Sequence, residues 1–180
     1  MADIEGSRRF CRTGVCEVLI PRALLWWAGG VFALDQASKA LVLYGLDLLE
    51  RGRIDVAPPY LVFQMAWNRG INFGLFSGGE ATRWVLVALA VAVSGWVLWW
   101  LRDDDRPLAM VAGGLLVGGA LGNVLDRLIY GAVADFLNMS CCGIENPYVF
   151  NVADIAIFVG AVGLALLPSR GAGRDGASRR

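Results

Sequence analysis

Histidine is absent from the 180 residues of the sequence, and cysteine is scarce, with four residues. Without histidine, the chain cannot carry a histidine-based catalytic triad, a histidine-ligated zinc site or a histidine general base. Cys11 and Cys16 lie in the N-terminal tail, and Cys141 and Cys142 are adjacent to each other. Because adjacent cysteines bridge each other only with strain, we expect unpaired thiols there. We also expect no metal ion and no cofactor in the functional site.

Charged residues are few, at 18% of the chain, against 57% hydrophobic residues. Soluble globular domains have about 25% charged and about 45–50% apolar residues, so this composition is typical of a membrane protein instead. The 16 basic and 16 acidic side chains cancel to a formal net charge of zero. This balance indicates no basic surface for nucleic acid, and we expect no nucleic-acid partner.

Four apolar runs are present, and each is near the roughly 20 residues that a bilayer-spanning helix requires. They cover residues 23–46, 84–101, 108–125 and 149–167. The first run follows a basic N-terminus, but it is too long for the core of a signal peptide and is interrupted by Asp35 and Lys39, so we expect a retained helix. The sequence therefore predicts an all-α membrane protein with four transmembrane helices, as one domain over residues 1–180 with a four-span core at residues 22–168.

Arginine residues outside these runs give an orientation. They gather before the first run, between the second and third runs, and after the fourth (Arg8, Arg9, Arg12, Arg22; Arg102, Arg106; Arg170, Arg174, Arg179, Arg180). By the positive-inside rule these segments are cytoplasmic, including both termini at residues 1–21 and 169–180. The C-terminal tail is rich in small, polar and charged residues, which is typical of disorder.

The long loop at residues 47–83 falls on the outer side in this orientation. It is rich in aromatic and β-branched residues and is broken by Pro58 and Pro59, a pattern that favours short strands on the membrane surface. Trp67, Phe73 and Phe76 in this loop suit the membrane–water interface.

Glycines recur every four residues in the third run, at Gly114, Gly118 and Gly122. Small residues at this spacing let two helices approach closely in a membrane. We expect these glycines to serve helix packing.

The polar residues in or beside the spans fall at one level in this orientation, on the outer side of the bilayer. They are Asp35 and Lys39 in the first run, Asn123, Asp126 and Arg127 at the end of the third, and Asn151 and Asp154 at the start of the fourth. Ionisable residues in spans usually face a protein interior or a cavity and mark function. Mutual neutralisation would explain some of these charges, with Asp35–Lys39 as a structural ion pair and Asp126–Arg127 as a pair that anchors the helix end at the interface. Asp135 and Asp154, however, have no basic partner nearby in the sequence.

Two carboxylates without histidine or a metal site suggest aspartic-type hydrolysis. Two nearby aspartates cannot both ionise easily and therefore share one proton. The ionised side chain takes a proton from water, and the water attacks a carbonyl carbon. The protonated side chain donates to the carbonyl oxygen or to the leaving amine. Such a site needs water, which fits a position near the outer membrane face.

Four short blocks resemble the bacterial lipoprotein signal peptidase family, also called signal peptidase II. They are DQASK at residues 35–39, NRGINF at 68–73, GNVLDRLIYGAVADF at 122–136 and FNVAD at 150–154, and they follow the order of the family. The blocks cover about a sixth of the chain. Their order and spacing, together with four apolar runs, make the resemblance specific.

The resemblance implies that Asp135 and Asp154 are the catalytic pair and that Asp126 supports them. It also implies further residues that bind substrate or support the site: Asp35, Lys39, Asn68, Gly70, Asn123, Arg127 and Asn151. The implied fold has four transmembrane helices, a small extracytoplasmic β-cradle and a short periplasmic helix, in the bacterial cytoplasmic (inner) membrane. The implied reaction removes the signal peptide of a prolipoprotein just before a diacylglyceryl-modified cysteine. We expect a monomer, with membrane lipids around it.

Two features depart from the family pattern. Asn72 stands where the family usually has a small alanine, which adds an amide to the pocket. The segment LNMSCCGIENPY at residues 137–148 carries the paired cysteines where a flap over the site would lie. Substrate range or inhibitor sensitivity could therefore differ from that of other members.

Three other interpretations stay open. A Ser–Lys peptidase using Ser38 and Lys39 would need adjacent helix residues to face each other, which they do not. A small transporter could use Asp35, Lys39 and Asp154 as a proton relay, but transport calls for polar residues at several depths. A member that binds lipoproteins without cleaving them would keep the same blocks.

Overall fold

The computed structural model describes residues 11–12, 15–16, 20–70, 80–143 and 146–167. The predictions for Asn72, Phe73, Phe76 and the C-terminal tail lie outside these residues. In the N-terminal tail, the two-residue strands β1 (Cys11–Arg12) and β2 (Val15–Cys16) pair antiparallel.

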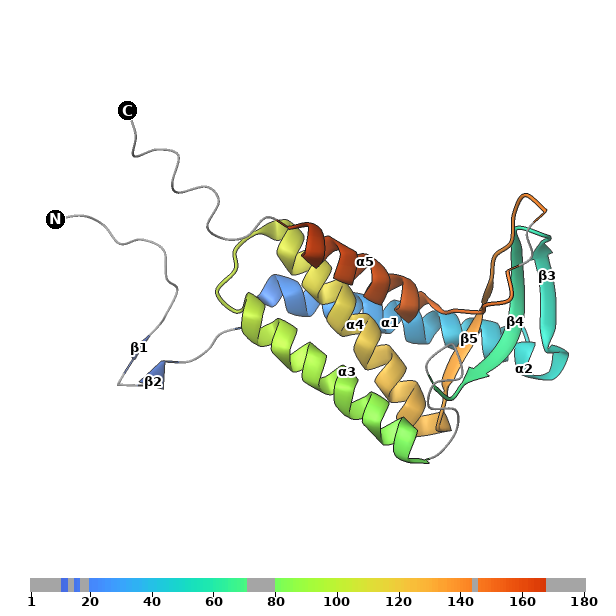
Figure 1. Ribbon diagram of the computed structural model, residues 1–180, viewed down its shortest axis with the longest axis horizontal. Coiled ribbons are helices and arrows are strands. Elements are labelled where there is room, and N and C mark those ends of the chain that lie inside the picture. The colour runs from blue at the N-terminus through green and yellow to red at the C-terminus, as the bar shows by residue number, and fades with distance from the viewer. Residues whose placement is uncertain (1–10, 13–14, 17–19, 71–79, 144–145, 168–180) are drawn as a thin grey trace.

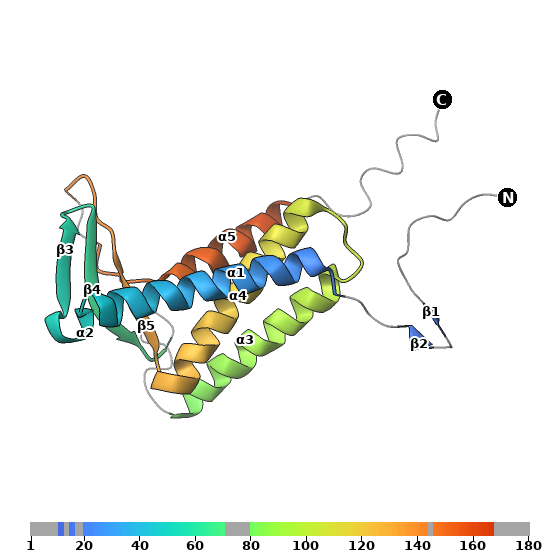
Figure 2. The same cartoon turned by 180° about the vertical axis from the view of Figure 1, so that it is seen from behind.

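Among the described residues, four long helices make up the body of the molecule (Figure 1). They are α1 (Arg22–Ala40), which continues as the π-helical turn η1 (Leu41–Gly45), α3 (Glu80–Leu101), α4 (Pro107–Tyr130) and α5 (Val152–Leu166). The central helix is α4, which packs against the other three. Seen from behind, α1 crosses in front of α4 (Figure 2). Each predicted apolar run therefore forms a helix, with changed boundaries.

Two boundaries differ from the prediction for local reasons. The helix α4 runs five residues beyond residue 125 to Tyr130 and is capped by Gly131, whose φ of +76° is a left-handed conformation that glycine adopts readily. The helix α5 begins at Val152 rather than at residue 149, because Asn151 caps it. The Asn151 side chain accepts the N–H of Asp154, and the Asp154 carboxylate accepts the N–H of Asn151. Asp154 therefore lies in the first turn of α5, not one turn further along.

A three-stranded antiparallel sheet lies beyond one end of the helices (Figure 1). Its strands are β3 (Arg53–Ala57), β4 (Leu61–Asn68) and β5 (Val133–Asn138), in the order β3-β4-β5, and the short helix α2 (Leu48–Arg51) precedes them. The predicted strands on either side of Pro58 and Pro59 are thus confirmed. One apolar cluster joins the sheet to η1 and α2, and its buried members are Val42, Leu43, Leu48, Ala134 and Phe136. This cluster fixes β5 against η1, at the C-terminal end of α1.

Glycines let the helix backbones approach closely. A Cβ atom added at Gly118 of α4 would collide with the carbonyl oxygen of Ala28 in α1. One added at Gly160 of α5 would lie 2.6 Å from the carbonyl oxygen of Ala112 in α4. The packing role predicted for the glycines of the third run is therefore confirmed at Gly118 and also holds at Gly114, where a Cβ would collide with the Trp27 side chain.

In the part of the chain that the structure describes, α3 and α4 are long and apolar enough, by length and composition, to cross a membrane. The helix α5 is apolar but has 15 residues, and α1 contains Asp35 and Lys39. The outward surface of α3 is apolar, with exposed Trp84, Leu89 and Trp96. The arrangement with four membrane spans remains a prediction.

Replacing Gly118 by alanine should destabilise the fold, because the new methyl group must push α1 away from α4. Overpacking of this kind costs about 1–3 kcal/mol. The matched control is Gly30→Ala on α1, where nothing lies within 4 Å of the added Cβ; there alanine should be neutral or stabilising by up to about 1 kcal/mol. Thermal unfolding in detergent, followed by tryptophan fluorescence, measures both variants. Equal unfolding temperatures for Gly118→Ala and the unaltered protein would show that the close contact of α1 and α4 at Gly118 leaves room for a methyl group.

Candidate active site

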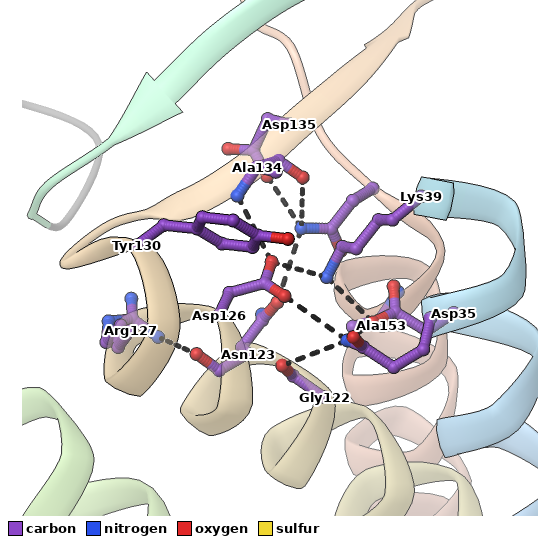
Figure 3. A network of polar contacts seen from close by, with 12 residues as sticks. Asp35, Lys39, Gly122, Asn123, Asp126, Arg127, Tyr130, Ala134, Asp135 and Ala153 are labelled. Carbon is purple, nitrogen blue, oxygen red and sulfur yellow. Dashed lines mark hydrogen bonds and ion pairs between the residues drawn. The ribbon is translucent and has the colours of Figure 1, made fainter. Parts of the chain in front are cut away.

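A buried cluster of polar side chains lies where the helices meet the sheet (Figure 3). Eight of the ten predicted site residues belong to it and are joined by hydrogen bonds and ion pairs, directly or through backbone groups: Asp35, Lys39, Asn68, Asn123, Asp126, Asp135, Asn151 and Asp154. The two others lie at its edge. Gly70 donates its N–H to the Asn68 side chain at 3.2 Å, and Arg127 donates to the Asn123 carbonyl oxygen at 3.3 Å.

Lys39 lies between two carboxylates (Figure 3). Its Nζ is 2.7 Å from Oδ2 of Asp35, one turn earlier on α1, and 2.7 Å from Oδ2 of Asp126 on α4. The relative exposure is 0% for both aspartates and 4% for Lys39. Charges this deeply buried are stable only when they are paired and hydrogen-bonded, which these are. The predicted pair Asp35–Lys39 is confirmed, and Asp126 completes it.

Gln36 joins the same two carboxylates from a different direction. Its Nε2 donates to Asp35 Oδ2 at 3.1 Å, to Asp126 Oδ1 at 3.2 Å and, more weakly, to the carbonyl oxygen of Gly122 at 3.4 Å. The sequence interpretation did not single out Gln36. Its place within the DQASK block, three residues before Lys39 on the same helix, is the signal that could have identified it.

A chain of amides connects Asp135 to Asp154. The Asn151 side chain donates to Asp135 Oδ1 at 2.6 Å and to Asn123 Oδ1 at 3.3 Å. Asn123 in turn donates to Asp154 Oδ1 at 2.9 Å. Asn68, at the end of β4, donates to the second Asp135 oxygen at 3.1 Å. Two carboxylates that are 19 positions apart in the sequence are therefore held in one hydrogen-bonded system.

The two aspartates differ in their surroundings. Asp135 is 2% exposed, and its burial, together with the nearby charge of Asp154, raises its pKa to about 7. The amides of Asn68 and Asn151 and the charge of Lys39 oppose this rise without cancelling it. Asp154 is only partly buried. The pair therefore combines a buried carboxyl group whose pKa is raised to about 7 with a second carboxyl group that is partly exposed.

The observed contacts contradict two interpretations made from the sequence. Asp126 does not pair with Arg127, because neighbours on a helix point about 100° apart, and Asp126 turns toward Lys39 instead. The Ser38 hydroxyl donates to the carbonyl oxygen of Asp35 at 2.8 Å, and the Lys39 ammonium is held by two carboxylates. A Ser38–Lys39 nucleophile pair is therefore not formed.

Cys141 and Cys142 are free and exposed, in the loop between β5 and α5. The Asn138 side chain holds this loop by donating to the carbonyl oxygens of Asn146 and Tyr148, at 2.8 and 3.0 Å. Over the described ranges, no group of three or more Cys, Asp or Glu side chains is placed to hold a metal ion.

Known proteins resemble the chain over most of its length. Residues 27–168 match the family described as signal peptidase (SPase) II. The chain is 50% identical over 136 residues to the lipoprotein signal peptidase of Methylorubrum extorquens (strain PA1), which covers 74% of this chain and 78% of the relative. It is 44% identical over 136 residues to the lipoprotein signal peptidase of Rhodopseudomonas palustris (strain ATCC BAA-98 / CGA009). This match covers 73% of this chain and 82% of the relative.

Two solved structures, each described as a bacterial membrane enzyme, have a similar fold. One has a TM-score of 0.66 at 25% identity and covers 80% of this chain and 85% of its own. The other has a TM-score of 0.67 at 25% identity, and the match covers 83% of this chain and 95% of the solved one. The resemblance predicted from four short blocks is thus confirmed over residues 27–168, and the chain belongs to the signal peptidase II family of lipoprotein signal peptidases, which are proteases.

Proposed function

We propose that the chain is an intramembrane aspartic endopeptidase in which Asp135 and Asp154 form the catalytic dyad. Its substrates are prolipoproteins that carry diacylglycerol on a cysteine, and it cleaves the peptide bond just before that cysteine. One observation carries the proposal: a buried aspartate with a pKa raised to about 7 shares a hydrogen-bonded system with a partly exposed aspartate. Pairs of carboxyl groups with such different surroundings are typical of acid–base chemistry.

The dyad holds one proton in its active form, mainly on Asp135. The Asp154 carboxylate takes a proton from a water molecule, and the water oxygen bonds to the carbonyl carbon of the peptide. Asp135 donates its proton to the carbonyl oxygen, which develops negative charge. As the carbon–nitrogen bond breaks, the proton taken up by Asp154 passes to the leaving nitrogen. One hydroxyl of the intermediate returns its proton to Asp135 as the carbonyl group re-forms. The amides of Asn68, Asn123 and Asn151 hold the two carboxyl groups in place during these steps.

The lengths of the helices support a site below the outer membrane surface. We propose that α1, α3, α4 and α5 all span the bacterial cytoplasmic membrane, with both termini in the cytoplasm. The 24 residues of α4 measure about 36 Å, and the 15 residues of α5 about 22 Å, against about 30 Å of hydrocarbon. The outer end of α5 lies beside Gly119 and Gly122, about two turns before α4 ends. Asp154 is then at the depth of the outer leaflet, where the acyl chains of a lipid-modified cysteine lie.

A monomer is sufficient for this function, because every residue of the dyad and of its amide chain comes from one chain. Lipids cover the apolar outer faces of the helices in this arrangement. We propose that Asn72 and the Cys141–Cys142 loop make the substrate range of this protein differ from that of other family members.

Replacing either dyad aspartate by asparagine should abolish cleavage. General acid–base catalysis contributes about 10²–10⁴-fold, so each of Asp135→Asn and Asp154→Asn should lose at least that much. The matched control is Asp55→Asn, an exposed carboxylate on β3 paired with Arg53. Release of the signal peptide from a synthetic diacylglyceryl-modified prolipoprotein, in detergent, gives the rates. Full activity in either dyad variant would overturn the assignment, and an inactive unaltered protein that still binds substrate would indicate a non-cleaving binder.

The cleavage rate should fall as the pH rises through about 7. Asp135 must be protonated in the active form, and its raised pKa of about 7 means that the proton is lost above that pH. The pH dependence of kcat/KM, measured from about pH 5 to about pH 9 with the fold followed by circular dichroism, tests this. A rate that instead rises with pH over this range would show that the essential group must lose a proton.

A further inference from the structure

We propose that Asp35, Lys39 and Asp126 form a positioning clamp for the catalytic dyad: two carboxylates, joined through one ammonium, each hold the backbone N–H of the residue before a catalytic aspartate. The proposal rests on the dyad assigned under Proposed function. It gives these three residues a role distinct from substrate binding and from proton transfer.

The two backbone contacts have the same form. Asp126 Oδ2 accepts the N–H of Ala134 at 3.1 Å, and the next residue is Asp135. Asp35 Oδ1 accepts the N–H of Ala153 at 2.9 Å, and the next residue is Asp154. Ala153 lies in the first turn of α5, where N–H groups have no partner within the helix and the helix dipole favours a negative charge. Each carboxylate thus sets the backbone position from which one dyad side chain extends.

The two carboxylates are in turn tied to each other. Lys39 Nζ is 2.7 Å from each of them (Figure 3). Gln36 also donates to both, at 3.1 and 3.2 Å. Gly122 leaves the room that this needs, because a Cβ there would lie 2.6 Å from Asp35 Oδ2. The separation of the Ala134 and Ala153 amides, and with it that of the dyad, therefore depends on contacts between α1 and α4.

Neither clamp carboxylate is available for chemistry. Both are 0% exposed. Asp35 uses Oδ1 for Ala153 and Oδ2 for Lys39 and Gln36. Asp126 uses Oδ1 for Gln36 and Oδ2 for Lys39 and Ala134. A group without a free oxygen or access to water cannot serve as a general base, whereas it can hold a backbone amide.

The charge balance decides which variants test the clamp. Its two carboxylates and one ammonium allow one carboxylate to be removed while the other still pairs with Lys39. Removing Lys39 would instead leave two buried carboxylates without a counter-charge, which would unfold the site for an unrelated reason. Aspartate variants are therefore the informative ones.

The first test compares an acceptor with a non-acceptor at Asp126. Asp126→Asn keeps an oxygen for the Ala134 N–H, so kcat should fall less than about 10-fold. Asp126→Leu has no acceptor, and a dyad misplaced by about 1 Å should lower kcat about 10²-fold with KM nearly unchanged. Asp55→Leu on the surface of β3 is the matched control. Equal kcat values for Asp126→Leu and Asp126→Asn would overturn the clamp.

The second test reads the two amides directly, by hydrogen exchange of the alanine N–H groups in ¹⁵N-alanine-labelled protein. Asp126→Leu should accelerate exchange at Ala134 more than at Ala153, and Asp35→Leu should do the reverse. A general loss of stability would accelerate both equally in both variants, and that result would reject the clamp. The pH dependence of kcat/KM adds a third readout. A greater separation of the two dyad carboxyl groups weakens the effect by which the charge of Asp154 raises the pKa of Asp135. In the clamp variants, the fall of kcat/KM at high pH should therefore begin at a lower pH.

The dyad variants separate failure of the clamp from failure of the proposed function. If Asp135→Asn and Asp154→Asn are inactive but Asp126→Leu has the kcat of the unaltered protein, only the clamp is wrong. If either dyad variant cleaves normally, the proposed function is wrong, and the clamp falls with it.

Discussion

The ammonium of Lys39, buried between two carboxylates, is the interaction on which the rest of the site depends. Paired charges in a protein interior require close contact and complete hydrogen bonding. Here they bring α1 against α4, and the same two aspartates also accept backbone N–H groups of β5 and α5. The helices and the sheet are thus joined at the point where the proposed chemistry takes place.

Close helix packing makes this contact possible. Gly114 and Gly118 let α1 approach the middle of α4, and Gly122 leaves space for Asp35 one turn further along. The row of small residues ends where the polar cluster begins. The same face of α4 thus serves apolar packing over most of its length and charge pairing toward its C-terminal end, so the geometry of the polar cluster depends on the helix packing beside it.

Much of this could be predicted from the sequence, since it depends on local patterns. The four apolar runs form helices, and the four motif blocks identify the family and most of the polar cluster. The partner of Asp126 could not be predicted, because Lys39 lies far away in the sequence and reaches it only through the crossing of α1 and α4. The connection from Asn151 through Asn123 to Asp154 likewise depends on the exact start of α5, which the Asn151 cap sets.

The contact between α1 and the later helices has a consequence for biosynthesis. In the proposed arrangement, the ribosome releases Asp35 and Lys39 long before Asp126 and Ala153 exist, so until then the two charges have only each other as charged partners. The first helix thus gains its full set of partners only after the fourth has been made. Since that last helix also brings Asp154, the proposed dyad is complete only after α5 has been synthesised.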